Sequence, residues 1–261
     1  MAQFTRSEMA RILVCLREGQ INEALTVVKS VLSSVRTPSR SADATDEISG
    51  VSAEEGLGNV VGSLLGGHLL RSSVPPILEK LINMRQQSRA KIGFSISDIV
   101  ALGNQMEYAN MSVTTVQNWV KRDVKELIST PQAGKKYSVE QMATIFIIED
   151  LKSSLDFDSI RKVLALIFND PTSDEDDLIH PVDFLAAYAT IFEDLRRQGT
   201  PIAEVAKRAR EFAYTLPVLN EIQRGFIEST IVIAVLSLQA SNFQVTAKTL
   251  ASTTIIGKQL T

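Results

Sequence analysis

The chain is organised around residues 94–160, which read FSISDIVALGNQMEYANMSVTTVQNWVKRDVKELISTPQAGKKYSVEQMATIFIIEDLKSSLDFDSI. Apolar residues at helical spacing predict a first helix over residues 98–108, which a preceding serine can cap. Residues 109–111 then predict a turn, and Ser112 is placed to cap a second helix over residues 113–122. Two short helices joined by a tight turn are the arrangement of a helix-turn-helix.

The second predicted helix has an apolar face and a polar face. Val116, Trp119 and Val120 recur at helical spacing and predict the inner face. In a helix-turn-helix the second helix lies in the major groove, where base edges and phosphates require donors, acceptors and cations. The outer face offers Thr114, Thr115, Gln117, Asn118, Lys121 and Arg122. An ordinary solvated helix face carries the same residue types, so both interpretations stay open on this helix alone.

A loop with two lysines follows the second helix. Pro131 and Gly134 favour a turn between two short extended arms, which predicts a small β-wing. The returning arm carries Lys135, Lys136 and Tyr137, and its lysines are placed to reach a phosphate backbone. Residues 112–136 hold five cations and two acids, a local charge of +3 in a chain whose total is −3. The chain therefore concentrates positive charge on this module.

These motifs resemble the MerR-type winged helix-turn-helix, and the resemblance covers residues 94–200. It rests on a recognition-helix segment, a wing and a last element, which are Thr115–Trp119, Lys135–Ser138 and Leu155–Ile160. It looks closest to a branch of Gram-positive bacteria described only as a domain of unknown function. The resemblance implies binding to double-stranded DNA. Gln117 and Asn118 stand where the family has Arg and an aromatic residue, so it implies no particular DNA sequence. The metal-sensing chemistry of that family is not expected, because no coiled coil with effector-binding cysteines follows the module.

The composition argues against several classes of protein. With 261 residues and 44% hydrophobic content, the chain can bury a sizeable core. Its single cysteine, Cys15, excludes an intrachain disulfide and lies in an apolar helical pattern typical of a small buried residue. His68 and His180 do not combine with it into a zinc site, and the acidic residues 169–178 lack the pattern of a calcium loop. Because no catalytic constellation or phosphate-binding loop is found either, we expect no enzyme activity, no cofactor and no metal.

We expect a mainly α fold, in which a winged helix-turn-helix with a small β-wing lies between an N-terminal helical region and a C-terminal helical bundle. Ser138 and Gln141 open the helix after the wing as a capping box. The predicted regions are an N-terminal helical hairpin (1–35), a flexible linker (36–56), a helical connector (57–93), the MerR-like module (94–170) and a C-terminal domain for dimerisation or sensing (171–261). The last helix, from Asn220 to Ala240 or beyond, is apolar nearly all round, which is typical of a bundle centre or a subunit interface.

The N-terminus carries charges throughout its apolar stretch, unlike a secretory signal, and the most apolar run, Ile231–Leu238, is too short to span a bilayer. We therefore expect a bacterial cytoplasmic protein without membrane contact, nucleoid-associated when bound. The leading hypothesis is a homodimeric, sequence-specific DNA-binding transcriptional regulator, with a protein or small-molecule effector left open. The alternative is a protein-interaction adaptor that uses the winged helix without binding DNA, which the net acidity, Gln117 and Asn118 favour. A small-molecule-sensing helical domain is a weaker third interpretation.

Overall fold

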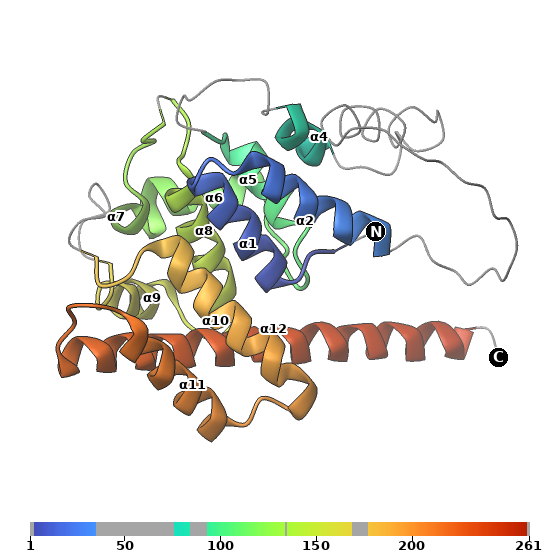
Figure 1. Cartoon of the computed structure of the whole chain (residues 1–261). Helices are drawn as coiled ribbons and strands as arrows, with labels where there is room; N and C mark the ends of the chain where they lie inside the picture. The colour runs from blue at the N-terminus through green and yellow to red at the C-terminus, as the bar shows by residue number, and fades with distance from the viewer. Residues whose placement is uncertain (1–2, 35–75, 84–92, 134, 169–176, 260–261) are drawn as a thin grey trace, which may run out of the picture.

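The computed structural model describes residues 3–34, 76–83, 93–133, 135–168 and 177–259, which form a mainly helical fold, as the sequence predicts (Figure 1). The predicted linker over 36–56, most of the connector over 57–93 and His68 lie outside these residues, as do residues 169–176 of the acidic loop. In chain order the elements are α1 (Arg6–Arg17), α2 (Ile21–Ser34), α4 (Pro76–Asn83), α5 (Ile96–Gly103), α6 (Val113–Asn118), the π-helical turn η2 (Trp119–Asp123), α7 (Lys125–Ile128), α8 (Val139–Leu151), α9 (Phe157–Leu164), α10 (Pro181–Leu195), the 3-10 turn η3 (Arg196–Gln198), α11 (Ile202–Thr215) and α12 (Glu221–Gln259).

The described part of the chain contains no β-strand, so the β-wing predicted from the sequence is not found as a pair of strands. Three isolated bridges occur instead, and two of them, Ala133 with Lys136 and Phe94 with Tyr137, lie at the predicted wing. The ladder does not lengthen away from the turn. Its next hydrogen-bonded pair would be Pro131 with Ser138, but Pro131 has no N–H, and the Ser138 N–H donates to the side chain of Gln141 at 3.0 Å.

Helix α8 lies at the centre of the fold. All but one of its 13 residues are buried, and it packs against α1, α7, α10 and α12 (Figure 1). The sequence explains this position, because residues 142–148 read MATIFII and leave no polar face. A helix that is apolar all round must be covered on every side. Ser138 and Gln141 form the predicted capping box at its start.

A buried ion pair and a hydrogen bond join the C-terminal end of α8 to α1, which precedes it, and to α10, which follows it. Asp150 accepts hydrogen bonds from Arg6 of α1 at 2.8 Å and from the Tyr188 hydroxyl of α10 at 2.7 Å. The side chains of Arg6 and Asp150 are 3% and 1% exposed. Burial beside the Asp150 carboxylate raises the pKa of Tyr188 well above its usual value, so its hydroxyl stays a donor. Arg6 also donates to the backbone carbonyl of Glu107, between α5 and α6.

The N-terminal helices pack into the main core. Thr5 and Glu8 start α1 with a capping box, and Phe4 pairs with the chain after α5 through Phe4 N–Gln105 O at 2.7 Å and Glu107 N–Phe4 O at 2.9 Å. One hydrophobic cluster contains residues from the predicted regions 1–35, 94–170 and 171–261. The boundaries between these regions stay predictions, but the regions that the structure describes share one core.

The C-terminal helices cover α8 and then leave the body. Helix α12 is much longer than the minimum that the sequence indicated, and its second half projects beyond the other helices (Figure 1). By length and composition alone, residues Glu221–Ile255 could cross a membrane, and 39% of the most apolar 18-residue window is buried. A core helix of a soluble protein meets the same criteria. The cytoplasmic location therefore stays a prediction.

We predict that Arg6→Met destabilises the protein strongly. The substitution leaves the buried Asp150 carboxylate without its cation, which costs about 3–5 kcal/mol in the free energy of unfolding. Urea unfolding followed by circular dichroism measures the change. Arg11→Met is the matched control, because Arg11 lies on the same helix but is exposed. Equal stability of the two variants would show that the buried pair does not hold the fold together.

Candidate nucleic-acid interface

The two helices of the predicted helix-turn-helix are joined by a tightly held connection, residues 104–112. The Asn104 side chain donates to the Met111 carbonyl at 2.9 Å and accepts from the Met111 N–H at 2.8 Å. Gly103 ends α5 in close contact with this segment, since an added Cβ would lie 1.7 Å from Met111 Cε and 3.0 Å from Phe146 Cε1. The connection therefore depends on a small residue at its start and on an amide that bridges it.

The second helix begins as predicted but does not continue as predicted. Ser112 caps it by accepting from the Thr115 N–H at 3.0 Å, and Val116, Trp119 and Val120 are buried. The prediction of one α-helix over residues 113–122 is wrong, because α6 ends at Asn118 and a π-helical turn follows.

Two interactions accompany this break in the helix. The Val124 N–H bonds to the carbonyl of Trp119, five residues back, at 3.1 Å, while the Asp123 carbonyl accepts from Arg161 of α9 at 2.6 Å. The Trp119 ring packs edge-on against the Phe157 ring, with 5.9 Å between the ring centroids. Contacts with the segment that contains α9 thus hold the end of the helix out of α-helical register.

The predicted site residues on this helix divide into two groups. Thr114, Asn118, Lys121 and Arg122 are exposed, whereas Thr115 and Gln117 are half-buried. Thr115 belongs to the helix cap, with its hydroxyl 2.7 Å from that of Ser112. The Arg122 guanidinium is held by the neighbouring Asp123 at 2.7 Å. Among the described residues, no ion pair includes Lys121, or Lys125 four residues further on.

The loop that carries the other predicted residues is a minimal hairpin. Ala133 and Lys136 exchange backbone hydrogen bonds at 2.9 and 3.1 Å, and Phe94 and Tyr137 do so at 2.8 and 2.9 Å. Lys135 and Lys136 are exposed and Tyr137 is half-buried. Within the described ranges, neither lysine has a carboxylate partner.

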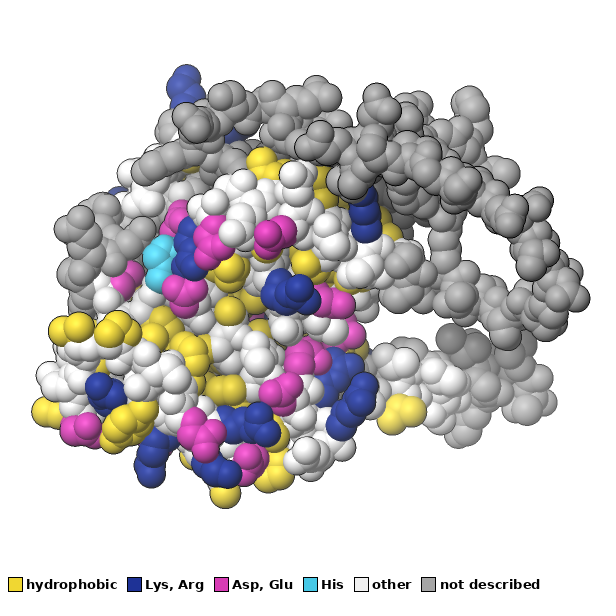
Figure 2. All heavy atoms as spheres, in the orientation of Figure 1, with side chains coloured by type: hydrophobic (Ala, Val, Ile, Leu, Met, Phe, Trp, Pro, Cys, Tyr) yellow, Lys and Arg dark blue, Asp and Glu magenta, His cyan; other side chains and the backbone are white. Residues whose placement is uncertain are grey.

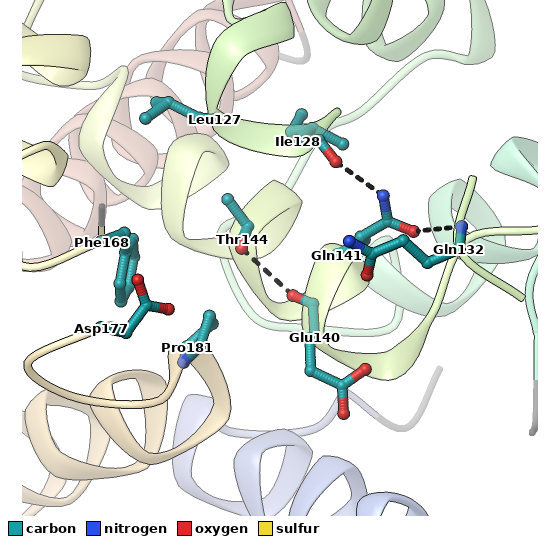
Figure 3. A pocket seen from close by; sticks show the side chains of 9 residues that line it. All are labelled: Leu127, Ile128, Gln132, Glu140, Gln141, Thr144, Phe168, Asp177 and Pro181. Atoms are coloured by element: carbon teal, nitrogen blue, oxygen red, sulfur yellow. Dashed lines mark hydrogen bonds between the residues drawn. The ribbon is translucent and has the colours of Figure 1, made fainter. Parts of the chain in front are cut away.

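Gln141 fixes the base of this loop from inside α8. Its amide nitrogen donates to the carbonyls of Ile128 at 2.6 Å and Thr130 at 2.7 Å, and its oxygen accepts from Gln132 and Ser138 (Figure 3). The capping-box spacing revealed that Gln141 starts a helix. It gave no sign that the same amide also holds the preceding loop, because that role depends on how the loop folds back.

The two acids within residues 112–136 are each paired with an arginine. Asp123 is held by Arg122, and Glu126 lies 3.0 Å from Arg161 of α9. Within the part of the chain that the structure describes, the unpaired charges of the second helix and the loop are therefore the exposed lysines Lys121, Lys125, Lys135 and Lys136. We call these four residues the lysine group. Lys125 contributes to the local charge of residues 112–136 but is not among the DNA-binding residues predicted from the sequence.

A shallow pocket beside the module offers little room. It is lined by Leu127, Ile128, Gln132, Glu140, Gln141, Thr144, Phe168, Asp177 and Pro181 (Figure 3), and it suits a water molecule better than an effector. Among the described residues, no three His, Cys, Asp or Glu side chains gather as they would around a metal ion.

We predict that Gly93→Ala loosens the hairpin. An added Cβ would lie 2.8 Å from both Ala133 Cβ and Lys136 Cβ, which are short and close to the backbone, so the hairpin must shift. We expect a loss of about 1–3 kcal/mol in stability and faster hydrogen exchange at the amides of Ala133, Lys136 and Tyr137. Gly225→Ala is the control, because its Cβ meets nothing within 4 Å. Unchanged exchange in Gly93→Ala would contradict the close packing.

Comparison with known proteins places the chain in a family without assigning a function. The model of "Domain of unknown function (DUF1836)" matches residues 90–189, which include the whole lysine group. "Uncharacterized protein YkrK" from Bacillus subtilis (strain 168) is 37% identical over 170 residues, which cover 62% of this chain and 73% of YkrK. No solved structure matches. Neither similarity extends to a named MerR-type protein, so that resemblance stays a prediction. The chain belongs to the uncharacterised bacterial family that it shares with YkrK and that carries the DUF1836 domain.

Proposed function

We propose that this protein is a sequence-specific DNA-binding transcriptional regulator that acts as a homodimer in the cytoplasm. In this proposal α5 and α6 work as a helix-turn-helix, and the hairpin at residues 133–136 works as a reduced wing. The observation that carries the proposal is the lysine group, because its four exposed cations have no carboxylate partner in the described structure. Unpaired surface cations are what the phosphate backbone of DNA binds.

In this proposal the helix contacts bases in the major groove and the loop contacts the phosphate backbone. Thr114 and Asn118 are four residues apart on α6 and are both exposed. Side chains at this spacing share a helix face, so they can enter the major groove together. Lys121 follows in the π-helical turn and is exposed as well. Lys135 and Lys136 sit on a loop that Gln141 holds from the core. A loop fixed in this way can hold phosphate without a large entropic cost.

The lysine group gives the first test. DNA fragments selected from a genomic library at fixed salt would supply a target, and fluorescence anisotropy would measure affinity against salt concentration. We expect Lys121→Ala/Lys125→Ala and Lys135→Ala/Lys136→Ala each to weaken binding at least tenfold and to lower the salt slope by up to about two.

The matched control is Lys162→Ala/Lys207→Ala, which removes the same charge elsewhere. Both control lysines have carboxylates nearby, Asp158 at 2.6 Å and Glu204 at 3.9 Å. If both lysine-group variants bind the selected DNA as tightly as the control does, the proposal is wrong.

Asn118 gives a separate test of sequence reading. Its exposed amide can donate to and accept from an adenine edge, a contact that contributes about 1–3 kcal/mol of discrimination. We expect Asn118→Ala to bind the selected site more weakly but unrelated DNA as the parent does. Equal weakening on both DNAs would assign Asn118 to the backbone or to the fold instead.

A second candidate function is a protein-interaction adaptor that uses the same module without DNA. Three observations favour it. The Arg122 guanidinium is engaged by Asp123, Gln117 is half-buried, and the helix that would enter the groove is interrupted after Asn118. The library selection separates the two candidates, because an adaptor enriches no DNA fragment at any salt concentration.

A further inference from the structure

Helix α12 carries a second apolar face that the body of the protein does not cover. Its core face buries Ile227, Ile231, Ala234, Val235 and Leu238 completely. On the other side, Ile222, Leu236, Phe243 and Leu250 are 70%, 36%, 64% and 63% exposed. These four residues belong to one row with a spacing of seven, whose remaining member is Ser229.

A second row accompanies the first, four residues further along. It contains Phe226, Ile233, Ala240, Ala247 and Thr254. Phe226, Ile233 and Ala240 are half-buried, and the last two members are exposed. Two rows that repeat every seven residues and are offset by four form the contact face of a two-stranded helix pair. We call these ten residues the α12 seam. It runs without a break from the part of α12 on the body to the part that projects.

The projecting part is poorly suited to stay helical alone in water. Between residues 240 and 255 the sequence has a single charged residue, Lys248, and many β-branched residues. Figure 2 shows no charged side chains on the visible face of this segment. Thr249, Thr253 and Thr254 bond their hydroxyls to carbonyls four residues back. Such a segment has low intrinsic helix propensity and lacks stabilising ion pairs. Its helical form therefore requires a partner surface.

The partner is not the interior of a bilayer. The apolar segment of α12 is long enough to cross a membrane only if it includes residues such as Ile227, Ile231 and Val235. Those side chains are fully buried against the body, so insertion would pull the helix out of the core. The seam needs a partner that binds without disturbing the core face.

We propose that the α12 seam pairs antiparallel with the α12 seam of a second copy of this chain. We place the two-fold axis on the seam side of α12, at the level of residue 238 along the helix. Each row then faces the other row of the second copy. Ile233 then meets Phe243 of the partner subunit, and Ser229 meets the partner's Ala247. Phe226 likewise meets the partner's Leu250, so two kinds of layer pair large residues, and the small pair lets the helices approach closely. No charged residue enters the contact face in this register, as the pairing of two uncharged faces requires.

This register also makes the interface long enough. The projecting part alone, residues 241–259, is about 28 Å long, whereas the whole of α12 is about 58 Å long. In the proposed register each projecting part lies on the body half of the other copy, so both halves of the seam are buried. A stable interface needs roughly 800 Å² per partner, which favours use of the full seam over contact between the projecting parts alone. The pairing supplies the homodimer that the proposed function requires.

The mass of the full-length protein in solution tests the pairing. We expect a dimer for the parent, and a rise of about 100-fold or more in the dimer dissociation constant for Phe243→Glu, because each dimer would bury two unpaired carboxylates. Ser252→Glu is the matched control, since Ser252 lies on the same exposed segment but on the side opposite the seam. It should stay dimeric. Circular dichroism checks that the body of each variant remains folded.

A cross-link tests the register. In a Cys15→Ser background, Ser229→Cys combined with Ala247→Cys should give a covalent dimer on oxidation, while either cysteine alone should not. A monomeric parent, a Phe243→Glu variant that dimerises as the parent does, or a double-cysteine variant without cross-link would each overturn the proposed pairing. A monomeric parent that binds lipid vesicles would assign the seam to a membrane surface and would also overturn it.

Because these measurements use no DNA, they are independent of DNA recognition. A dimer of the expected register that binds no DNA would support the pairing and contradict the proposed DNA-binding function. A monomer that binds DNA through the lysine group would contradict the pairing and support DNA binding.

Discussion

The buried carboxylate of Asp150 is the constraint on which the rest of the structure depends. It lies at the C-terminal end of the central helix α8 with 1% of its side chain exposed. A buried charge is tolerated only with a counter-ion and further hydrogen bonds, and here Arg6 and Tyr188 provide them. One partner comes from the first helix of the chain and the other from α10. The central helix is therefore held by partners that come before and after it in the chain, and residues 94–160 share their hydrophobic core with α1 and α10.

The two ends of α8 position different parts of the proposed interface. At its start, Gln141 holds the hairpin that carries Lys135 and Lys136. Near its end, Glu149 accepts from the Asn110 N–H at 3.2 Å in the connection that precedes α6. Arg6 reaches the Glu107 carbonyl in the same connection. Because α8 is rigidly packed, the helix and the loop that would touch DNA are both positioned from one element. Such preorganisation lowers the entropy lost on binding.

The sequence predicted what is encoded locally and missed what depends on distant contacts. Ser112 and Ser138 were recognisable as helix caps because the cap residue and its partner are three residues apart. The π-helical turn after Asn118 was not predictable, because it is accompanied by a bond from Arg161, 38 residues away. The pairing of Arg6 with Asp150 spans 144 residues and has no local signature. The predicted β-wing was correct as a turn but wrong as strands, because Pro131 has no N–H and Gln141 accepts from the Ser138 N–H, so the next ladder bonds cannot form. Whether the site binds DNA stays a prediction.

Helix α12 shows why an apolar pattern does not identify a partner. Its sequence is apolar nearly all round, which predicts a bundle centre or a subunit interface. The structure accounts for one side, which packs against α8, α10 and α11. The other side repeats every seven residues, whereas a straight helix repeats every 3.6, so this row drifts by about 20° per repeat unless the helix supercoils. Contact with the body alone does not require a seven-residue repeat in the part of α12 that projects beyond the body. The repeat from Ile222 to Leu250 is the pattern that contact with a second helix requires, and we propose that this helix is the α12 of a second copy.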